Sequence, residues 1–246
     1  MKRYGLLGYP LGHSFSARFF AEKFRREGID AEYVNFEMPS VEGLRTFIAA
    51  DPALCGLNVT IPHKQAVIPR LDALTDEAQA IGAVNVIAIS RGETGLRLVG
   101  ANTDAVGFRR SIEPLLRPCH RRALVLGTGG ASRAVVYVLR RLGIEPCLVS
   151  RTERPGAVAY ASLTPDDVRA HHVIVNCSPV GMYPHTDECP ALPYDALTED
   201  HLLYDLVYNP EETLFMRRGR ERGATVKNGL EMLHLQALAA WDVWTR

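Results

Sequence analysis

Apolar and polar positions alternate with two different periods from the start of the chain. Residues 4–8, "YGLLG", form a short apolar run of the length expected for a buried strand. Residues 14–28 follow, with four phenylalanines spaced so that they share one face of a helix. Ser14 is suited to cap that helix and Gly28 to end it. The pattern therefore predicts a strand followed by an amphipathic helix.

The alternation continues in two series along the chain. In the first series we expect strands at 31–38, 55–61, 83–90 and 95–100, a helix at 41–50, and short helices within 64–82. In the second series we expect a strand, a glycine turn and a helix over 122–143, strands at 146–152, 172–179, 201–210 and 223–229, and a last helix at 230–244. Strands that alternate with helices in this way indicate a mostly parallel α/β fold.

The two series predict two domains. The length of 246 residues suits one large domain or two of ordinary size. We place the boundary within 101–104, so that residues 1–101 form the first domain and residues 102–229 the second. The terminal segment 230–246 is predicted to return and pack on the first domain.

Composition narrows the class of protein. Apolar residues make up 47% and charged residues 23%, as in a soluble globular protein. Lys+Arg and Asp+Glu number 28 each, so the net charge is zero. The overall charge therefore gives no indication of a nucleic acid or an acidic membrane as partner. No apolar run reaches the ~18–20 residues of a membrane span, and the N-terminus lacks the apolar core of a signal peptide. Five cysteines without metal-ligand spacing predict reduced thiols, no metal site and a cytoplasmic location.

A glycine turn opens the second series. "VLGTGGASRA" places Gly127, Gly129 and Gly130 between an apolar strand and an amphipathic helix. Such glycines let the backbone approach a pyrophosphate, whose charge the helix N-terminus stabilises. Ser132 stands at the third glycine position of the usual pattern. We therefore predict a dinucleotide site, against the alternative of a merely tight strand–helix turn.

The end of the next strand bears on the choice of cofactor. An NAD-binding protein usually carries an acid there for the ribose 2′-hydroxyl. This chain has Ser150, Arg151 and Thr152, and then Glu153 and Arg154. A guanidinium and hydroxyls suit a 2′-phosphate, so the loop favours NADPH over NADH. The alternative is that the two arginines belong to an ordinary solvated loop.

A lone lysine follows the strand-like segment "NVTI". Pro62 stops that strand, because proline has no N–H for the sheet. Lys64 then has no phosphate-cradling glycines around it, so it is not a P-loop lysine. Taken alone it is a surface lysine at the start of a helix. Its meaning depends on the motifs elsewhere in the chain.

Those motifs resemble the shikimate dehydrogenase family. They occur in the family's order and span residues 5 to 237, which is more specific than a glycine turn alone. The motifs are "GYPLGHSFSARFF", "LNVTIPHK", "IGAVNVI", "NTDAVGF", "VLGTGGASRA", "VSRT", "NCSPVGM", "YDLVYNP" and "NGLEMLHLQA".

The resemblance implies a substrate domain followed by a Rossmann NADP-binding domain. It implies reversible reduction of 3-dehydroshikimate to shikimate with NADPH, a step toward chorismate and the aromatic amino acids. It identifies Lys64 as the catalytic lysine and Asp104 as its partner carboxylate. An ammonium can stabilise the alkoxide that develops on the ketone oxygen and supply its proton. The carboxylate is expected to orient Lys64 and the new hydroxyl.

The resemblance also implies the residues that bind the two ligands. A polyol acid needs many paired donors and acceptors. For the substrate they are Ser14, Ser16, Asn58, Thr60, Asn85, Asp104, Tyr208 and Gln236. For the cofactor they are Asp76, Gly127, Thr128, Gly129, Gly130, Ala131, Ser150, Arg151, Thr152, Arg154, Asn176, Ser178, Met182, Leu206 and Gly229.

Three departures from the family pattern stand out. Ser150 replaces the common Asn, which bears on an adenine-side contact. Ala105 follows "NTD" where the family usually has Gly. The stretch 152–172 is short, which predicts an abbreviated helix after the second strand of the Rossmann domain.

Two rival functions remain open at this point. One is a quinate/shikimate dehydrogenase that accepts NAD, whose cofactor loop would usually carry an acid where Arg151 stands. The other is a non-catalytic NADPH-binding sensor, which predicts loss of Lys64 or Asp104, although both are present. The expected partner is a small-molecule substrate, with no nucleic acid and no membrane. The oligomeric state is left open between monomer and homodimer.

Overall fold

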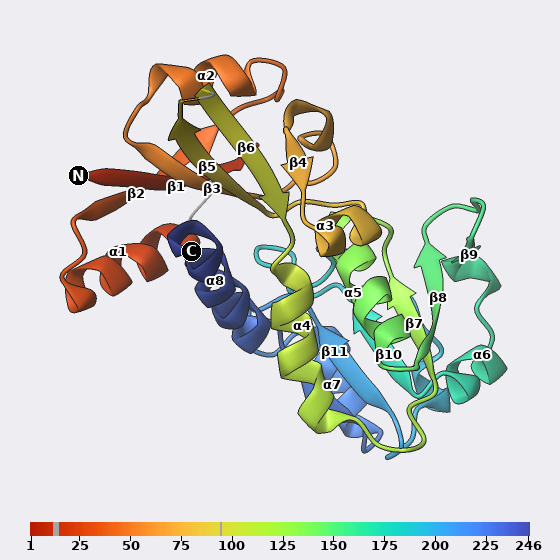
Figure 1. Cartoon of the computed structure of the whole chain (residues 1–246). Coiled ribbons are helices and arrows are strands. Elements are labelled where there is room, and N and C mark those ends of the chain that lie inside the picture. Colours follow the sequence, from red (N-terminus) through yellow and green to blue (C-terminus); the bar gives the residue numbers. More distant parts are fainter. Residues whose placement is uncertain (12–14, 94) are drawn as a thin grey trace. The chain divides into compact units, whose positions relative to one another are not determined.

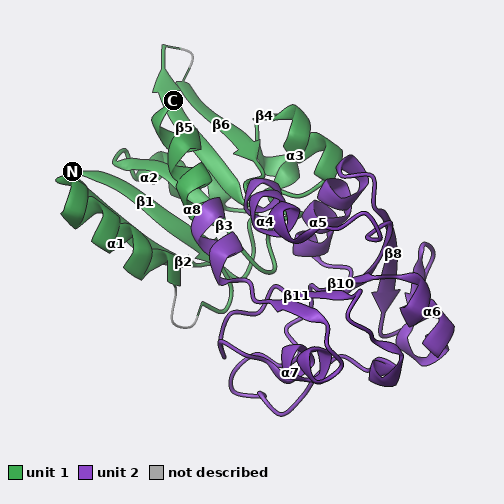
Figure 2. Ribbon diagram, turned by 90° about the horizontal axis from the view of Figure 1, so that it is seen from below, with its two compact units in different colours: residues 1–103, 237–246 green, residues 104–236 purple. Residues whose placement is uncertain are grey.

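The computed structural model describes residues 1–11, 15–93 and 95–246. The predicted substrate residue Ser14 therefore lies outside the described residues. The chain divides into two compact units (Figure 2). Unit 1 holds residues 1–103 and 237–246, and unit 2 holds residues 104–236.

Unit 1 is built on a six-stranded sheet with the order β2-β1-β3-β5-β6-β4. Strands β1 and β2, and β1 and β3, are parallel, whereas β5 is antiparallel to both β3 and β6. The strands are β1 (Lys2–Gly8), β2 (Ala31–Glu37), β3 (Leu54–Val59), β4 (Ala73–Leu74), β5 (Val86–Gly92) and β6 (Gly95–Ala101).

Helices cover both faces of this sheet (Figure 1). On one face, α2 (Leu44–Ala50) packs Leu44 and Ile48 into a core that includes Leu7 and Leu57. On the other face, α1 (Phe15–Glu27) and the end of α8 (Leu230–Thr245) bury an aromatic cluster. That cluster contains Tyr4, Phe20, Phe24, Trp241 and Trp244. Because successive strand residues point to opposite faces, Tyr4 and Leu7 of one strand serve the two different cores.

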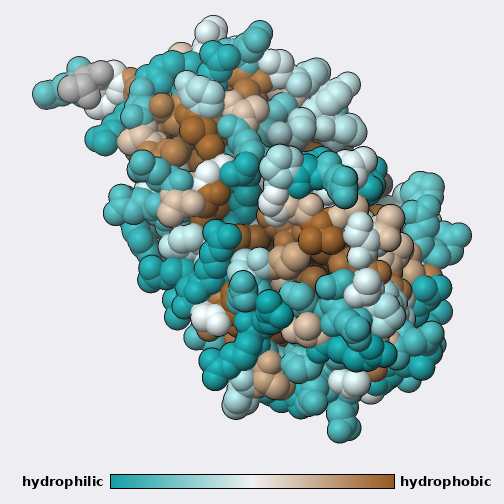
Figure 3. Space-filling model, turned by 90° about the vertical axis from the view of Figure 1, so that its right-hand side faces the viewer, coloured by the Kyte–Doolittle hydropathy of each residue, from teal (hydrophilic) through white to brown (hydrophobic). Residues whose placement is uncertain are grey.

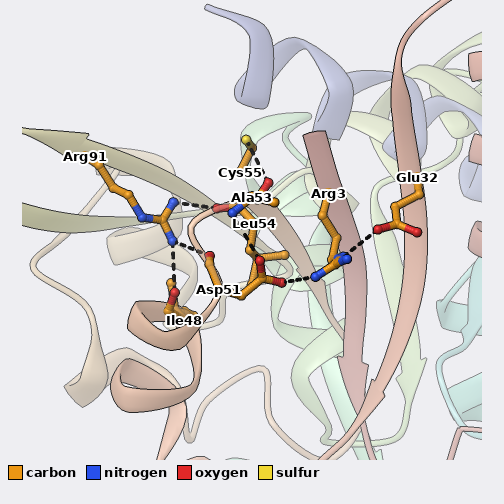
Figure 4. Close-up of polar contacts among 8 residues, drawn as sticks. All are labelled: Arg3, Glu32, Ile48, Asp51, Ala53, Leu54, Cys55 and Arg91. Atoms are coloured by element: carbon orange, nitrogen blue, oxygen red, sulfur yellow. Dashed lines mark hydrogen bonds and ion pairs between the residues drawn. The ribbon is translucent and has the colours of Figure 1, made fainter. Parts of the chain in front are cut away.

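Two arginines hold the amino edge of this sheet together (Figure 4). Arg3 on β1 bonds the carboxylates of Glu32 and Asp51, at 2.7 and 2.5 Å. Arg91 on β5 donates to the carbonyl oxygens of Ile48, Asp51 and Leu54. Since the last carbonyls of a helix have no partner within it, Arg91 satisfies acceptors at and just beyond the C-terminus of α2.

Unit 2 contains a parallel sheet with the order β12-β11-β10-β7-β8-β9. The strands are β7 (Arg122–Leu126), β8 (Glu145–Ser150), β9 (Ala157–Ala159), β10 (Val173–Asn176), β11 (Leu202–Asp205) and β12 (Thr225–Lys227). The helices are α4 (Asp104–Ile112), α5 (Gly130–Arg141), α6 (Pro165–Ala170) and α7 (Leu214–Glu221). The four residues Val173–Asn176 are all buried, as expected of a central strand in a parallel sheet.

Some element boundaries differ from the sequence expectation. The strand predicted at 55–61 ends at Val59, because residues beyond it turn back through the bond from His63 N to Thr60 O. The segment 64–82 is helical only at η1 (Ile68–Arg70) and α3 (Asp76–Ile81), with β4 between them. Its backbone pairs with β6 instead, since Asp72 N donates to Leu98 O and Thr75 N to Gly100 O.

The segment after β8 contains little helix, as the short stretch 152–172 predicted. No α-helix lies between Ser150 and Pro165; the chain forms the three-residue strand β9 and a short 3-10 helix, η3 (Tyr160–Ser162). The six-residue α6 then begins with a capping box made by Thr164 and Asp167.

The described surface is mainly hydrophilic on the face in Figure 3, where apolar residues gather in a few patches. Across the described residues, the large apolar side chains left exposed include Tyr9 and Ile61 in unit 1 and Met182 and Tyr183 in unit 2. None of the helices in these ranges is both long and apolar enough to cross a bilayer.

Candidate functional site

The polar residues of unit 1 gather at one edge of its sheet. Strands β1 and β3 end there, and β6 ends there too, because β5 pairs antiparallel with both β3 and β6. Asn58 lies opposite Val86, so Asn85 stands beside the end of β3. The same Val86 lies opposite Ala101, which brings the start of "NTD" to this edge. Residues far apart in sequence therefore meet at the carboxyl ends of parallel strands, where α/β folds usually bind ligands.

Lys64 sits in a turn beyond this edge rather than at a helix start. Its carbonyl oxygen accepts from Val84 N at 2.7 Å, which joins the turn to the segment before β5. The neighbouring His63 is buried, and its Nε2 lies 2.6 Å from the carbonyl oxygen of Met38. Two independent contacts thus fix the backbone on which the lysine is carried.

A hydrogen-bonded chain crosses the edge from α1 to β3. The phenol of Tyr33 donates to Asn58 Oδ1 at 2.7 Å and also bonds the hydroxyl of Ser16. Burial raises the pKa of Tyr33 far above its ordinary value, so the phenol stays a donor at any ordinary pH. The two predicted substrate residues, Ser16 and Asn58, are therefore held by a tyrosine that the sequence reasoning did not select.

Asn85 acts on the backbone just before Asp104. Its Oδ1 accepts from Thr103 N at 2.6 Å, and its Nδ2 donates to Thr103 Oγ1 at 3.0 Å. Asn102 is fixed in the same way, donating to Ala83 O at 2.9 Å. Both asparagines are buried. The first residues of "NTD" are thus clamped, and Asp104, itself 6% exposed, follows directly at the start of α4.

The predicted cofactor residues of unit 2 also converge at one edge. Strands β7, β8, β10 and β11 are parallel, so the segments after Leu126, Ser150, Asn176 and Asp205 leave the sheet on the same side. The chain order reverses between β7 and β10, which makes this the switch point of a doubly wound sheet.

The glycine turn at this point fits a dinucleotide phosphate. Gly127 adopts φ +113, which only glycine takes without strain. A Cβ at Gly129 would meet nothing within 4 Å, and no side chain caps the first turn of α5. An uncapped helix N-terminus beneath open space is suited to bind an anion through its amides. Thr128, Gly130 and Ala131 complete this turn.

The arginine loop lies next to the glycine turn. Arg154 Nη1 donates to Thr128 Oγ1 at 2.9 Å, which joins the loop after β8 to the loop after β7. Arg151 and Thr152 are exposed. Ser150 is buried, and its hydroxyl donates to the carbonyl oxygen of Thr152. Ser150 therefore shapes the loop that presents Arg151.

Five further predicted cofactor residues, which the resemblance assigns to the nicotinamide side, lie at or beyond the ends of β10, β11 and β12: Asn176, Ser178, Met182, Leu206 and Gly229. Ser178 donates through both its backbone N–H and its hydroxyl to Asn176 Oδ1. A Cβ on Gly229 would lie 2.2 Å from Leu206 O, so only glycine allows this approach. Met182 is 45% exposed, which argues against a role in core packing.

Three further predicted residues lie on other elements of the two units. Gln236 is buried on α8, where its Nε2 donates to Leu233 O at 2.8 Å, and Tyr208 is half-buried beyond β11. Asp76 is an exposed residue in the first turn of α3 of unit 1, where an acid stabilises the helix dipole without any ligand.

The sequence reasoning passed over Tyr33, Thr103, Asp205 and Thr213, all of them buried or half-buried polar residues that anchor predicted ones. Asp205 lies within the motif "YDLVYNP" and Thr103 within "NTDAVGF", so these motifs could have pointed to both residues. Tyr33 and Thr213 lie in none of the quoted motifs, so nothing in the sequence pointed to them.

The parallel sheet, its switch point and its glycine turn define unit 2 as a Rossmann-type dinucleotide-binding fold. Comparison with known proteins shows which family of dinucleotide-binding proteins the chain resembles. Residues 6–87 match the shikimate dehydrogenase substrate binding domain. The chain is 36% identical over 262 residues to a shikimate dehydrogenase (NADP(+)) of Carboxydothermus hydrogenoformans, covering 98% of this chain and 90% of the relative. It is 37% identical over 263 residues to the enzyme of that name from Methanopyrus kandleri, covering 98% and 89%.

A solved structure agrees with these relatives. Shikimate 5-dehydrogenase from Thermus thermophilus, in complex with NADP(H) and shikimate, superposes with a TM-score of 0.86 at 34% identity. The match covers 100% of this chain and 94% of that one. The chain belongs to the shikimate dehydrogenase family, which confirms the resemblance read from its motifs.

Proposed function

We propose that this protein catalyses the reversible, NADPH-dependent reduction of 3-dehydroshikimate to shikimate. The observation that carries the proposal is the family membership over nearly the whole chain, with NADP(+)-dependent relatives and with this chain's own motifs intact. The NADPH prediction from the arginine loop agrees with those relatives. Unit 1 would bind the substrate and unit 2 the dinucleotide.

The reaction needs a hydride at the ketone carbon and a proton at the ketone oxygen. NADPH supplies the hydride when it is bound. The chain supplies the rest: the Lys64 ammonium stabilises the negative charge that develops on oxygen and gives up a proton, which leaves an alcohol and a neutral amine. In the oxidation direction the same amine accepts the proton. Asp104 holds the hydroxyl and the lysine in place.

The polar edge of unit 1 suits a ring that carries several hydroxyls and a carboxylate. Ser16 and Ser14 would bind the carboxylate, and Asn58, Thr60 and Asn85 the hydroxyls. Asn58 and Asn85 are already oriented by Tyr33 and Thr103, so their side chains keep a set geometry. Tyr208 and Gln236 would complete the contacts.

The test is an absorbance assay at the nicotinamide band on the purified protein. Shikimate and quinate are each offered with NADP and with NAD. We expect turnover with shikimate and NADP to exceed that of the other three pairs. Preference for quinate with NAD would favour the first rival function, and binding of NADPH without turnover of either substrate would favour the sensor.

The catalytic assignment has its own test. Lys64→Ala should lower kcat by about 10²–10⁴-fold while shikimate binding, measured by calorimetry, changes little. Lys64→Met keeps most of the length of the side chain without its charge and should behave like Lys64→Ala. Turnover near the wild-type rate in either variant would move the proton transfer to another group.

We also propose a cytoplasmic location. All five cysteines are free thiols, as expected in a reducing compartment. The partners are then the two small molecules, and the oligomeric state stays open between monomer and homodimer.

A further inference from the structure

A buried carboxylate joins three chain segments at the cofactor edge of unit 2. Asp205, the last residue of β11, has no exposed surface. Its Oδ1 accepts from Asn176 Nδ2 at 2.9 Å and from Val207 N at 3.0 Å. Its Oδ2 accepts from Thr213 Oγ1 at 2.6 Å. Two carboxylate oxygens therefore serve three donors that come from the ends of β10 and β11 and from the start of α7.

Two of these donors belong to segments assigned to the cofactor, and the third caps a helix. Asn176 uses its other amide atom, Oδ1, to orient Ser178. Val207 N belongs to the turn that carries Leu206, against which Gly229 packs. The third donor, Thr213, caps α7 by accepting from Met216 N at 3.3 Å. Asp205 itself is too deeply buried to touch a ligand, so its effect must pass through these segments.

The charge is not balanced by a cation. The ion pairs found among the described residues do not include Asp205, and its bonding partners are neutral. The titratable groups that face it are the thiol of Cys177 after β10 and the phenol of Tyr194 on η4 (Tyr194–Ala196). The guanidinium of Arg218 on α7 lies over the Tyr194 ring, 5.1 Å from its centre.

Burial raises the pKa of Asp205 to about 6, although the hydrogen bonds from Thr213, Val207 and Asn176 act to lower it. The folded pKa thus exceeds the ordinary value of 3.8. Ionisation of this group therefore costs folding stability as the pH rises through about 6. A charge kept at such a cost is more often found at functional positions than in a core that serves stability alone.

We propose that Asp205 is a positioning residue: its ionised carboxylate holds the turns after β10 and β11 in the shape that binds the nicotinamide half of the cofactor. The inference rests on the proposed function, because that function places the cofactor at these turns. It extends the proposed function, because the affinity for the cofactor would then depend on whether the Asp205 carboxyl, which does not contact the cofactor, is protonated.

The chemistry requires the carboxylate rather than a neutral group. Protonation of Oδ2 would turn it from an acceptor into a donor toward Thr213 Oγ1. The Thr213 oxygen would then accept from both Oδ2 and Met216 N, and its own proton would lose the acceptor that the carboxylate provides. Protonated Asp205 and an asparagine at this position are therefore alike. Both keep one oxygen for Asn176 and Val207 and lose the bond from Thr213.

The experiment measures the Kd for NADPH of wild type and Asp205→Asn between pH 5 and 8 by NADPH fluorescence. At pH 8 the variant should bind roughly tenfold more weakly, the loss expected for one hydrogen bond to a charged group. At pH 5 the ratio of the two Kd values should approach 1, because the wild-type carboxyl is then neutral as well. The 2′-phosphate of NADPH titrates near pH 6 too, but equally for both proteins, so the ratio cancels it.

Thr213 provides a second measurement that does not remove the carboxylate. Thr213→Val removes at every pH the bond that protonation of Asp205 breaks, so at pH 8 it should bind NADPH about as weakly as Asp205→Asn, and the pH step in NADPH affinity should largely disappear. Thr213→Ser keeps the hydroxyl and should restore the wild-type profile. A purely structural role of Thr213 would weaken NADPH binding equally at every pH and leave the step in place.

Thermal unfolding at pH 8 separates positioning from folding. Since ionisation of Asp205 costs stability there, Asp205→Asn should not lower the Tm. A lower Tm together with a Kd ratio that is constant with pH would overturn the proposal. So would an unchanged Kd at pH 8. In both cases shikimate oxidation by the wild type would still stand, whereas a wild type that binds no NADPH would instead refute the proposed function.

Discussion

At the scale of single residues, a replacement near the cofactor edge illustrates how one side chain can shape a loop. Ser150 is buried and donates its hydroxyl to the carbonyl oxygen of Thr152, so the loop turns back at once after β8. Arg154 then reaches Thr128 on the glycine turn. The backbone of Arg151 lies between these two contacts, and its exposed guanidinium suits a phosphate at the ribose.

Arg151→Ala tests this placement. The variant should bind NADPH roughly tenfold or more weakly, because it loses charge-assisted bonds to the 2′-phosphate. Binding of NADH, which lacks that phosphate, should change much less. Arg141→Ala, at the opposite end of α5, removes an equal charge from an exposed position and serves as the control. Equal losses for NADPH and NADH would contradict the 2′-phosphate assignment.

At the scale of elements, a histidine fixes the amino edge of the unit 2 sheet. His201 directly precedes β11 and is 1% exposed. Its Nδ1 accepts from Thr198 N at 3.0 Å, and its Nε2 lies 3.0 Å from the carbonyl oxygen of Val168 on α6, so Nε2 carries the proton. Burial lowers the pKa of His201. A second proton on Nδ1 would face the N–H of Thr198.

This arrangement predicts acid sensitivity. Because the folded pKa of His201 is lowered, its contribution to stability is present above its ordinary value of 6.5 and is lost as the pH falls below that value. The free energy of unfolding, measured in urea between pH 5 and 8, should therefore depend less on pH in His201→Gln than in wild type. Asp205 acts in the opposite direction over part of this range, so the comparison with wild type is what isolates the histidine. His185→Gln, at an exposed position, should retain the wild-type dependence.

At the scale of the whole molecule, the last residues of the chain complete the unit formed by the first ones. Trp244 on α8 stacks on Tyr4, with ring centres 4.9 Å apart, and donates to Ile87 O at 3.1 Å. It lies so close to β3 that a Cβ on Gly56 would come within 2.3 Å of its ring. Unit 1 therefore contains residues from both ends of the sequence.

Trp244→Ala should destabilise the protein by about 3–5 kcal/mol, because it removes a large ring from a packed aromatic cluster. Urea unfolding followed by circular dichroism measures the loss. Leu238→Ala changes an exposed position on the same helix and should cost less than about 1 kcal/mol. A similar loss in both variants would contradict a specific contribution of this ring contact, because both substitutions introduce the same good helix former.

The alternation of apolar and polar positions determined most of the secondary structure, since periods of 3.6 and 2 follow from backbone geometry alone. The motifs likewise determined the family, which the relatives confirm. The pattern failed within 64–82, where β4 pairs with β6 through bonds that depend on residues about 25 positions away. The spacing of apolar residues within a short segment does not indicate that the segment will pair with a remote strand.

Only the tertiary structure decided which polar side chains anchor the others. Tyr33 meets Asn58, Asn85 meets Thr103, and Asp205 meets Thr213 because strand order brings separate segments to one edge of a sheet. The protonation preference of Asp205 also arises there, since burial depends on neighbours from several elements. The sequence by itself supplied residue types and local periods; distances between remote residues come from the folded chain.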